Sequence, residues 1–403
     1  MGWDPEFKPQ LRPLEAFPIQ DGNGNRVGLR DPGGLSDKVI SLSGAALHVM
    51  TMMDGTNTCR QIQDKAAVSF GAPLEDNTLQ SMIEQLEQAR FMDGPAFEEY
   101  YQSRLEEYRG ARVREMPHAS ALGIVDDSGA IFEEMLADAE PTALPKPVVG
   151  LIAPHLDYPR GRACYAAAYL TLRARPTPDR VVILGANHFG RSTSVVATAN
   201  DFQTPLGTTR TDLSFIEGLE ACCGHLREHE LDHAREHSIE LQVAWLQHLF
   251  GADSFAVVPF LCPDPCGPTG TAPCDNNGVD LRDFAAALAD LVAKDDRDTL
   301  LVAGADLSHV GAAFGDSRSL DAAFLEDVRA HDYRALANLS ANDPDGWLRC
   351  LAEDNNPMHV CSAGCIYVLV SAVRGATGTI LRYYQAVDQS SQTCVTCAAV
   401  AFA

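Results

Sequence analysis

The stretch that decides the fold is Val148-Val149-Gly150-Leu151-Ile152-Ala153-Pro154-His155, in which a short apolar run ends directly in a bend and a histidine. The same arrangement occurs twice more. The run Arg180 to Gly185 leads into Ala186-Asn187-His188, and the run Thr299 to Gly304 leads into Ala305-Asp306-Leu307-Ser308-His309. Aliphatic runs of this length without polar alternation are typical of strands buried on both faces of a parallel sheet. The sequence therefore predicts an α/β fold whose central strands end beside histidines.

These strand ends predict a shared metal site. Ligands of open α/β sheets bind at the carboxyl ends of the parallel strands, so we expect His155, His188 and His309 to converge there. Neutral imidazole binds iron, copper and zinc. Asp306 and His309 lie three residues apart in what we interpret as one loop, and a helical turn of this loop would bring both side chains to the site. His309 is then a third ligand or a general base, and Asp306 either fixes its tautomer or binds the metal itself.

Two further segments supply candidates. Cys361 stands just before an apolar helical pattern, where a thiolate has a lowered pKa and is a soft metal ligand; the alternative is a small buried side chain. Glu236, His237 and Glu240 fall in another helical pattern and are expected on one helix face. They are either supporting residues for the metal site or an ordinary charged helix start. We interpret the neighbouring polar stretch as solvated, including its histidines His225, His229 and His233.

The pattern of apolar runs divides the chain into two domains and a connecting helix. Residues 1–95 combine a turn at 22–25 with three short helical patterns and predict a small winged-helix-type α+β domain. Residues 96–111 are charged and helix-prone, which is typical of a linker helix. Residues 112–403 alternate strands with helices and predict a mostly parallel sheet flanked by helices. The expected elements of this domain are helices 161–174, 211–220, 236–250, 280–294, 318–338 and 362–373, and strands 148–153, 180–185, 255–261, 299–304 and 394–402.

Composition argues against several classes of partner. The formal net charge of −24 disfavours nucleic acid and anionic membrane surfaces, because both require basic patches. No apolar run reaches the length of a membrane span, and the first residues lack the basic and apolar regions of a secretory signal. We therefore expect a cytoplasmic protein, in which most of the twelve cysteines are reduced.

The chain contains six motifs in this order: Arg114 to Ser120, Ala153 to His155, Gly185 to His188, Glu236 to Glu240, Asp306 to His309 and the segment around Cys361. In kind and in order they resemble those of the Memo family, whose bacterial members are called AmmeMemoRadiSam system protein B. By resemblance, the fold is that of class III extradiol dioxygenases of the LigB type, with a mononuclear non-heme iron. His155, His188 and His309 then occupy the histidine positions of the Memo site, and Asp306 and Cys361 share the pocket. The resemblance covers roughly residues 112–403.

The resemblance leaves the third metal ligand open. The dioxygenases hold their metal with two histidines and a glutamate and use another histidine as base, so the third ligand here is either His309 or Cys361. We expect iron (Fe2+), with copper or zinc as alternatives. The supporting residues are expected to be Glu236, His237, Glu240, Asn187, Asp157 and His118.

Residues 12–93 resemble PqqD-like winged-helix domains through Arg12-Pro13, Leu42-Ser43 and Met53-Asp54-Gly55-Thr56. Such domains bind leader peptides in peptide-modifying systems. The resemblance of residues 112–403 to AmmeMemoRadiSam system protein B implies radical-SAM and AMMECR1-like proteins of the same system as partners. The sequence as a whole favours a redox enzyme with dioxygenase-like chemistry on a small organic or peptide substrate. The alternatives are a non-catalytic adaptor and a zinc-dependent hydrolase that uses metal-activated water.

Overall fold

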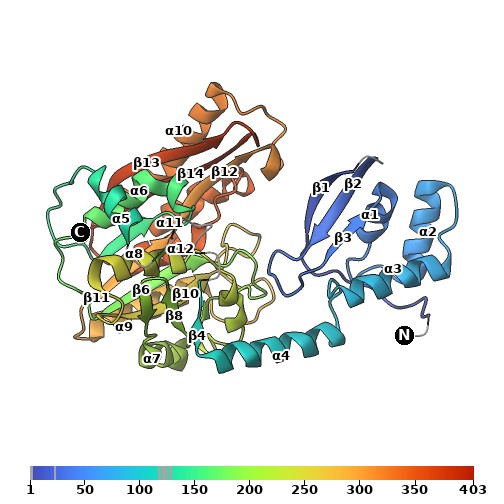
Figure 1. Cartoon of the computed structure of the whole chain (residues 1–403), viewed down its shortest axis with the longest axis horizontal. Coiled ribbons are helices and arrows are strands. Elements are labelled where there is room, and N and C mark those ends of the chain that lie inside the picture. Colours follow the sequence, from blue (N-terminus) through green and yellow to red (C-terminus); the bar gives the residue numbers. More distant parts are fainter. Residues whose placement is uncertain (1–2, 22–23, 117–118, 120–123, 125, 127–128) are drawn as a thin grey trace. The chain divides into compact units, whose positions relative to one another are not determined.

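The structure is a computed structural model, and it describes residues 3–21, 24–116, 119, 124, 126 and 129–403. Contacts within the chain group it into two compact units, Met1–Glu107 and Tyr108–Ala403. Figure 1 labels helices and strands of both units. Helix α4 (Pro95–Ala111) covers the segment expected to be a linker helix, and the division between the units falls within it.

The N-terminal unit is a three-stranded antiparallel sheet followed by three helices, in agreement with the small α+β domain expected there. Its helices begin at capping residues. Ser43 accepts a hydrogen bond from the backbone N–H of Ala46, and Thr58 forms a capping box with Gln61. The elements are β1 (Glu15–Asp21), β2 (Gly24–Arg30) and β3 (Val39–Leu42), which pair in that order, and then α1 (Gly44–Met50), α2 (Cys59–Phe70) and α3 (Asp76–Gln88).

The second unit is built on a mixed eight-stranded sheet with a parallel centre. The predicted parallel sheet is present as its four central strands, whose carboxyl ends meet at one edge. In spatial order they are β5 (Gly150–Ala153), β11 (Thr299–Gly304), β6 (Arg180–Ala186) and β10 (Ala256–Cys262). Antiparallel strands extend both sides, namely β14 (Thr393–Phe402) beside β5, β12 (Asp306–Gly311) and β13 (Gly378–Asp388) beside β14, and β7 (Val196–Ala197) beside β10.

Helices cover both faces of this sheet, as the uninterrupted apolar strands predict. Along β6, Val181 and Ile183 pack in one hydrophobic cluster, whereas Val182 and Leu184 pack in the other. The first cluster includes α5 (Ala130–Ala137), α6 (Tyr158–Leu170) and α8 (Glu240–Phe250). The second includes α7 (Leu213–Cys223), α9 (Leu281–Lys294), α11 (Pro344–Ala352) and α12 (Ala363–Ala372).

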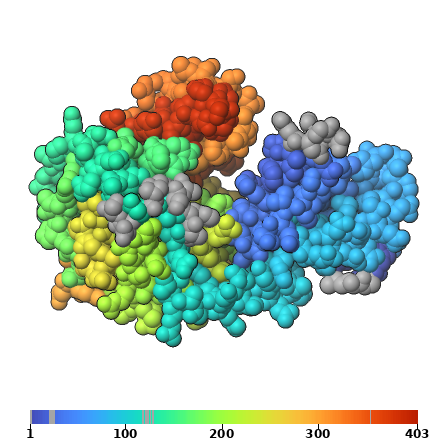
Figure 2. Space-filling view, in the orientation of Figure 1, coloured from blue at the N-terminus to red at the C-terminus, as the bar shows by residue number. Residues whose placement is uncertain are grey.

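The remaining elements lie around the sheet. Helix α10 (Ala322–Ser340) contacts β12 and β13, and Figure 2 shows its orange surface beside the red surface of the C-terminal strands. A separate small sheet contains β4 (Val113–Arg114), β8 (Asp201–Thr204) and β9 (Gly207–Thr209), and short 3-10 helices occupy Glu230–Ala234, Ala312–Phe314 and Glu353–Asn355.

Two predictions about elements are wrong. The segment after Ala305 is strand β12 rather than a helically turning loop, because it pairs with β14. The helix expected over 236–250 begins only at Glu240. Strand β13 and helix α11 were not predicted, since the half-exposed sequence of β13 contains no continuous apolar run. Within the described part of the chain, no helix has the length and apolarity needed to cross a membrane.

Candidate metal centre

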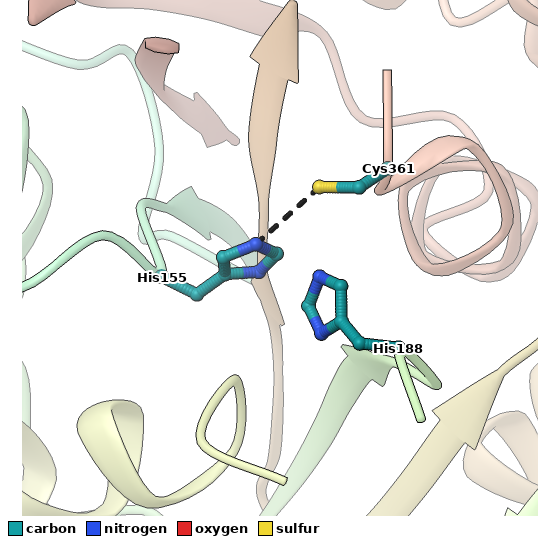
Figure 3. Close-up of side chains that lie close together, drawn as sticks. All are labelled: His155, His188 and Cys361. Carbon is teal, nitrogen blue, oxygen red and sulfur yellow. Dashed lines mark hydrogen bonds between the residues drawn. The ribbon is translucent and has the colours of Figure 1, made fainter. Parts of the chain in front are cut away.

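Three potential metal donors meet at the carboxyl edge of the parallel strands. His155 follows β5, His188 follows β6, and Cys361 precedes α12. Figure 3 shows the two imidazole rings and the thiol pointing into one shared space. The Nε2 atom of His155 lies 3.4 Å from the Sγ atom of Cys361, and the two ring centres are 4.9 Å apart. One donor atom of each residue lies within 4.8 Å of the other two, which is close enough for a single ion.

Hydrogen bonds through Nδ1 orient both imidazoles, so that Nε2 is the ring nitrogen available to a metal ion. Nδ1 of His155 lies 2.9 Å from the backbone carbonyl oxygen of Gly304, to which its N–H donates. Nδ1 of His188 lies 3.0 Å from Oε2 of Glu236. A ring nitrogen that donates in this way fixes the tautomer, and the lone pair of the other nitrogen is then available to a metal. Both rings therefore have the orientation that metal ligation requires.

Glu236 is a buried carboxylate that holds His188 at two points. Besides its contact with Nδ1, it accepts the backbone N–H of His188 at 3.1 Å and that of Ser238 at 2.9 Å. Burial alone would raise the pKa of Glu236, but His188 and His237 keep that pKa well below its ordinary value. Burial would likewise lower the pKa of His188, and the charge of Glu236 outweighs this effect and raises it. Glu236 therefore stays ionised beside the imidazole that it orients.

His237 forms a second group of potential metal donors together with His188 and Glu236. Its Nδ1 atom lies 3.4 Å from Oε1 of Glu236, and its ring stacks on that of His188 with the planes at 16°. His188, Glu236 and His237 also offer donor atoms within 4.8 Å of one another. The side chain of His237 is 33% exposed, so solvent reaches the site on this side.

Close approach of the 236–239 segment to the sheet depends on two glycines. A Cβ atom on Gly185 would lie 2.3 Å from Oγ of Ser238, and one on Gly304 would lie 2.1 Å from its backbone oxygen. This segment precedes α8, so the prediction that Glu236, His237 and Glu240 share one helix face is wrong.

Arg114 also holds the 236–239 segment and the start of α8. Its guanidinium pairs with buried Glu240 and donates to the backbone carbonyls of Glu236 and, at 2.9 Å, of His233. Arg114 begins the motif Arg114 to Ser120, but nothing in the local pattern marks it as buried. His233 is buried as well, with Nε2 3.0 Å from the oxygen of Val196, and burial lowers its pKa to about 3. The interpretation of this stretch as solvated is therefore wrong for His233.

Asp306 and His309 share one face of β12 through a β-bulge. Asp306 pairs with Cys397 and His309 pairs with Val395, so three steps along β12 correspond to two along β14. Partners in an antiparallel pair project to the same side, and residues two apart on β14 do so too. The bulge thus achieves the same-face placement that the sequence analysis expected from a helical turn.

Side chains from neighbouring elements secure this bulge. The backbone N–H of Ser308 donates to Oγ1 of Thr396 at 2.9 Å, and the hydroxyls of both residues donate to buried Asp332 at 2.6 Å. Ser362 accepts the backbone N–H of Asp306 at 3.0 Å. None of these four was predicted as a site residue. The available signal was the presence of Thr396 within the otherwise apolar core of β14.

The two titratable groups of β12 differ in their distance from the donors. Oδ2 of Asp306 lies 3.4 Å from Nε2 of His155, and burial raises the pKa of Asp306 to about 7. His309 bonds through Nδ1 to the carbonyl oxygen of Leu307 at 3.0 Å, and burial lowers its pKa to about 4. Among the described residues, neither group of three close donors includes His309. The structure thus brings Cys361 rather than His309 within reach of the first two donors.

The other predicted supporting residues have different partners. Asn187 donates to Asp232 at 3.0 Å and so shapes the loop after β6. Asp157 caps α6 by accepting the backbone N–H of Arg160 at 3.0 Å. His118 lies outside the described residues.

Comparison with known proteins identifies similar chains. The sequence model of the family described as Memo-like protein matches residues 126–402, which include every motif from Ala153 onward. A MEMO1 family protein of Methanopyrus kandleri is 30% identical over 246 residues, which are 60% of this chain and 77% of that protein. Others come from Thermus thermophilus (28% identical, 82% of this chain and 94% of that protein) and Aquifex aeolicus (25%, 78% and 79%). The last two alignments are longer than the second unit, so the similarity extends into the N-terminal unit.

Proposed function

This chain belongs to the Memo family, and on that premise we propose that its second unit is a mononuclear metal protein in which His155, His188 and Cys361 hold a redox-active transition-metal ion. The observation that carries the proposal is the orientation of the imidazoles. Both engage Nδ1, with Gly304 and Glu236 respectively, and leave Nε2 beside the Cys361 thiol. Histidines held in this way by a carbonyl or a carboxylate are typical of metal ligands.

The donor set supports iron or copper. Imidazole binds either metal, and a thiolate is a softer donor than the glutamate of the dioxygenase site, which strengthens the case for copper. Three protein ligands leave coordination positions open for substrate and dioxygen. When bound, such a metal supplies one-electron chemistry with dioxygen, so we propose dioxygenase-like oxidation of a small organic or peptide substrate. Zinc in the same site would instead favour hydrolysis.

Asp306 and His309 are proposed to handle protons in this reaction. With its pKa raised to about 7, Asp306 takes up or releases a proton near neutral pH, at a carboxyl oxygen close to His155. The lowered pKa of His309, about 4, keeps this imidazole neutral, and its Nδ1–H is held by Leu307. Nε2 of His309 is therefore free to act as a base.

For the N-terminal unit we propose the PqqD-like peptide-binding role expected from its sequence. The order of three antiparallel strands followed by three helices supports this assignment. The radical-SAM and AMMECR1-like proteins of the same system are the proposed partners.

Metal analysis of protein purified without oxygen tests the proposed function. We expect roughly one iron or copper ion per chain, a loss of that ion in His155→Ala, and its retention in His225→Ala, which removes an exposed imidazole elsewhere. A screen for substrate-dependent oxygen uptake then follows. Zinc as the sole metal would support the alternative of a zinc-dependent hydrolase. Protein that binds no metal under any of these conditions would contradict the proposed function and favour the non-catalytic adaptor.

A further inference from the structure

A small pocket in the N-terminal unit is lined by apolar side chains and three carboxylates. It has a volume of about 270 Å3 and lies between the segment before β1 and helices α2 and α3. No strand residue lines it. Apolar contact comes from Trp3, Phe7 and Ile83, and the acidic groups are Asp4, Glu84 and Glu87. Most of the exposed lining is apolar, so an aliphatic group can pack there next to the carboxylates.

The wall formed by the N-terminal segment is held in place by the helix that it contacts. The backbone carbonyls of Pro5 and Phe7 accept hydrogen bonds from the N–H groups of Arg60 and Cys59, at 3.0 and 2.8 Å. These N–H groups belong to the first turn of α2, which has no partners for them within the helix. The pocket is therefore built into the unit and does not depend on a loose side chain.

The three carboxylates have no cationic partner in the described part of the chain. Oε1 of Glu84 accepts the side-chain amide of Gln80 at 2.9 Å, and Asp4 accepts the backbone N–H of Glu6 at 2.9 Å, but neither forms an ion pair. Arg60, the cation next to the pocket residue Cys59, pairs with Glu6 instead, at 3.7 Å. Three negative charges around an apolar cavity favour a ligand that is apolar in the middle and positively charged at its end.

We propose that this pocket binds a lysine or arginine side chain of a partner polypeptide. Such side chains have a long aliphatic stem that packs against apolar walls and a charged end that bonds to carboxylates. The volume is below the range of about 300–1,000 Å3 that whole small ligands occupy, and it suits a single anchoring side chain. The pocket shares no residue with the candidate metal site, so a result on peptide binding leaves the proposed metal function untouched.

Trp3 makes the test direct, because it is the one tryptophan that a ligand in this pocket would touch. The chain has three tryptophans, and Trp245 and Trp347 are both fully buried. We would titrate the full chain with the acetylated, amidated tripeptides Leu-Arg-Leu, Leu-Lys-Leu and Leu-Glu-Leu and follow tryptophan fluorescence. A saturable change with the two basic peptides, absent with the acidic one and in Trp3→Phe, is the expected result.

A charge-matched pair of variants locates the binding. The double variant Glu84→Gln, Glu87→Gln should weaken binding of Leu-Arg-Leu about tenfold or more, because charge-assisted hydrogen bonds are lost. Asp64→Asn, Glu106→Gln removes two exposed carboxylates of the same unit and should leave the affinity unchanged. The proposal is overturned if neither basic peptide gives a saturable change, if Leu-Glu-Leu binds equally well, if both double variants behave alike, or if Trp3→Phe keeps the signal.

Discussion

Replacing Glu236 by glutamine should weaken metal binding without unfolding the protein. The carboxylate serves three N–H groups, namely Nδ1–H and the backbone N–H of His188 and the backbone N–H of Ser238. A glutamine offers one carbonyl oxygen and places an NH2 group where the second oxygen accepted. At least one buried N–H then faces another donor, which costs about 1–3 kcal/mol of unfolding free energy. Loss of the carboxylate that orients a ligating histidine lowers metal affinity about 10–100-fold.

The pH of the measurement matters, because Glu236 also raises the pKa of His188. Protons then compete with the metal for this imidazole, and wild-type affinity should rise with pH. The glutamine variant should show a shallower rise, since it lacks the charge that raises the pKa of His188. Fewer protons compete at pH 8.5 than at neutral pH, so the affinity difference measured there reports the orientation of His188 more directly. Competition titrations with a chromogenic chelator, for metal-free wild type and variant, give the dissociation constants.

Glu230→Gln is the matched control. Glu230 is equally buried and accepts from the Thr198 hydroxyl, the Ala199 N–H and the Arg109 guanidinium. None of the three proposed metal ligands is among its hydrogen-bond partners in the described part of the chain. It should lose a similar amount of stability in urea unfolding and keep its metal affinity. Our reasoning fails if Glu236→Gln binds metal as tightly as wild type at pH 8.5, or if the two variants lose affinity equally.

Three further outcomes are expected. Cys361→Ser should lower metal affinity at least tenfold. Cys365→Ser should not lower it, because the Sγ atom of Cys365 is directed at backbone carbonyls. Equal affinities of the two variants in chelator competition would show that Cys361 is not a ligand. Gly304→Ala should lower the free energy of unfolding, measured in urea, by several kcal/mol, on the order of other strained core changes, because its Cβ would lie 2.1 Å from the Ser238 oxygen. The control Gly44→Ala, whose Cβ would meet nothing within 4 Å, should be neutral or slightly stabilising. His233 has its pKa lowered from 6.5 to about 3, so the folded protein binds fewer protons than the unfolded chain and stability is lost as the pH falls through this range. His233→Gln should therefore lose less stability than wild type between pH 7 and pH 4, and parallel pH profiles would contradict the assigned burial.

Much of the fold could be predicted because burial on both sheet faces requires continuous apolar strands. Strands β6 and β11 begin and end within one residue of their expected positions, and the final strand matches β14. Strand β13 escaped prediction because its outer face is half-exposed and its sequence mixes aromatic, polar and charged residues. The start of α8 was misplaced because the 236–239 segment has helical residue types, yet its hydrogen bonds go to His188 and Arg114.

The sequence by itself determined where His155 and His188 lie, because each follows a buried parallel strand and the ends of these strands meet at one edge of the sheet. Only the tertiary structure decided which further potential donor lies close to them. Cys361 is 206 residues away from His155 along the chain, and it reaches the site through the packing of α12 under the sheet. The placement of His309 and Asp306 on one face of β12 was likewise decided by the tertiary structure, because the β-bulge depends on the pairing of β12 with β14. Contacts between segments so far apart leave no periodic pattern in a single sequence, whereas burial of a strand or a helix face does.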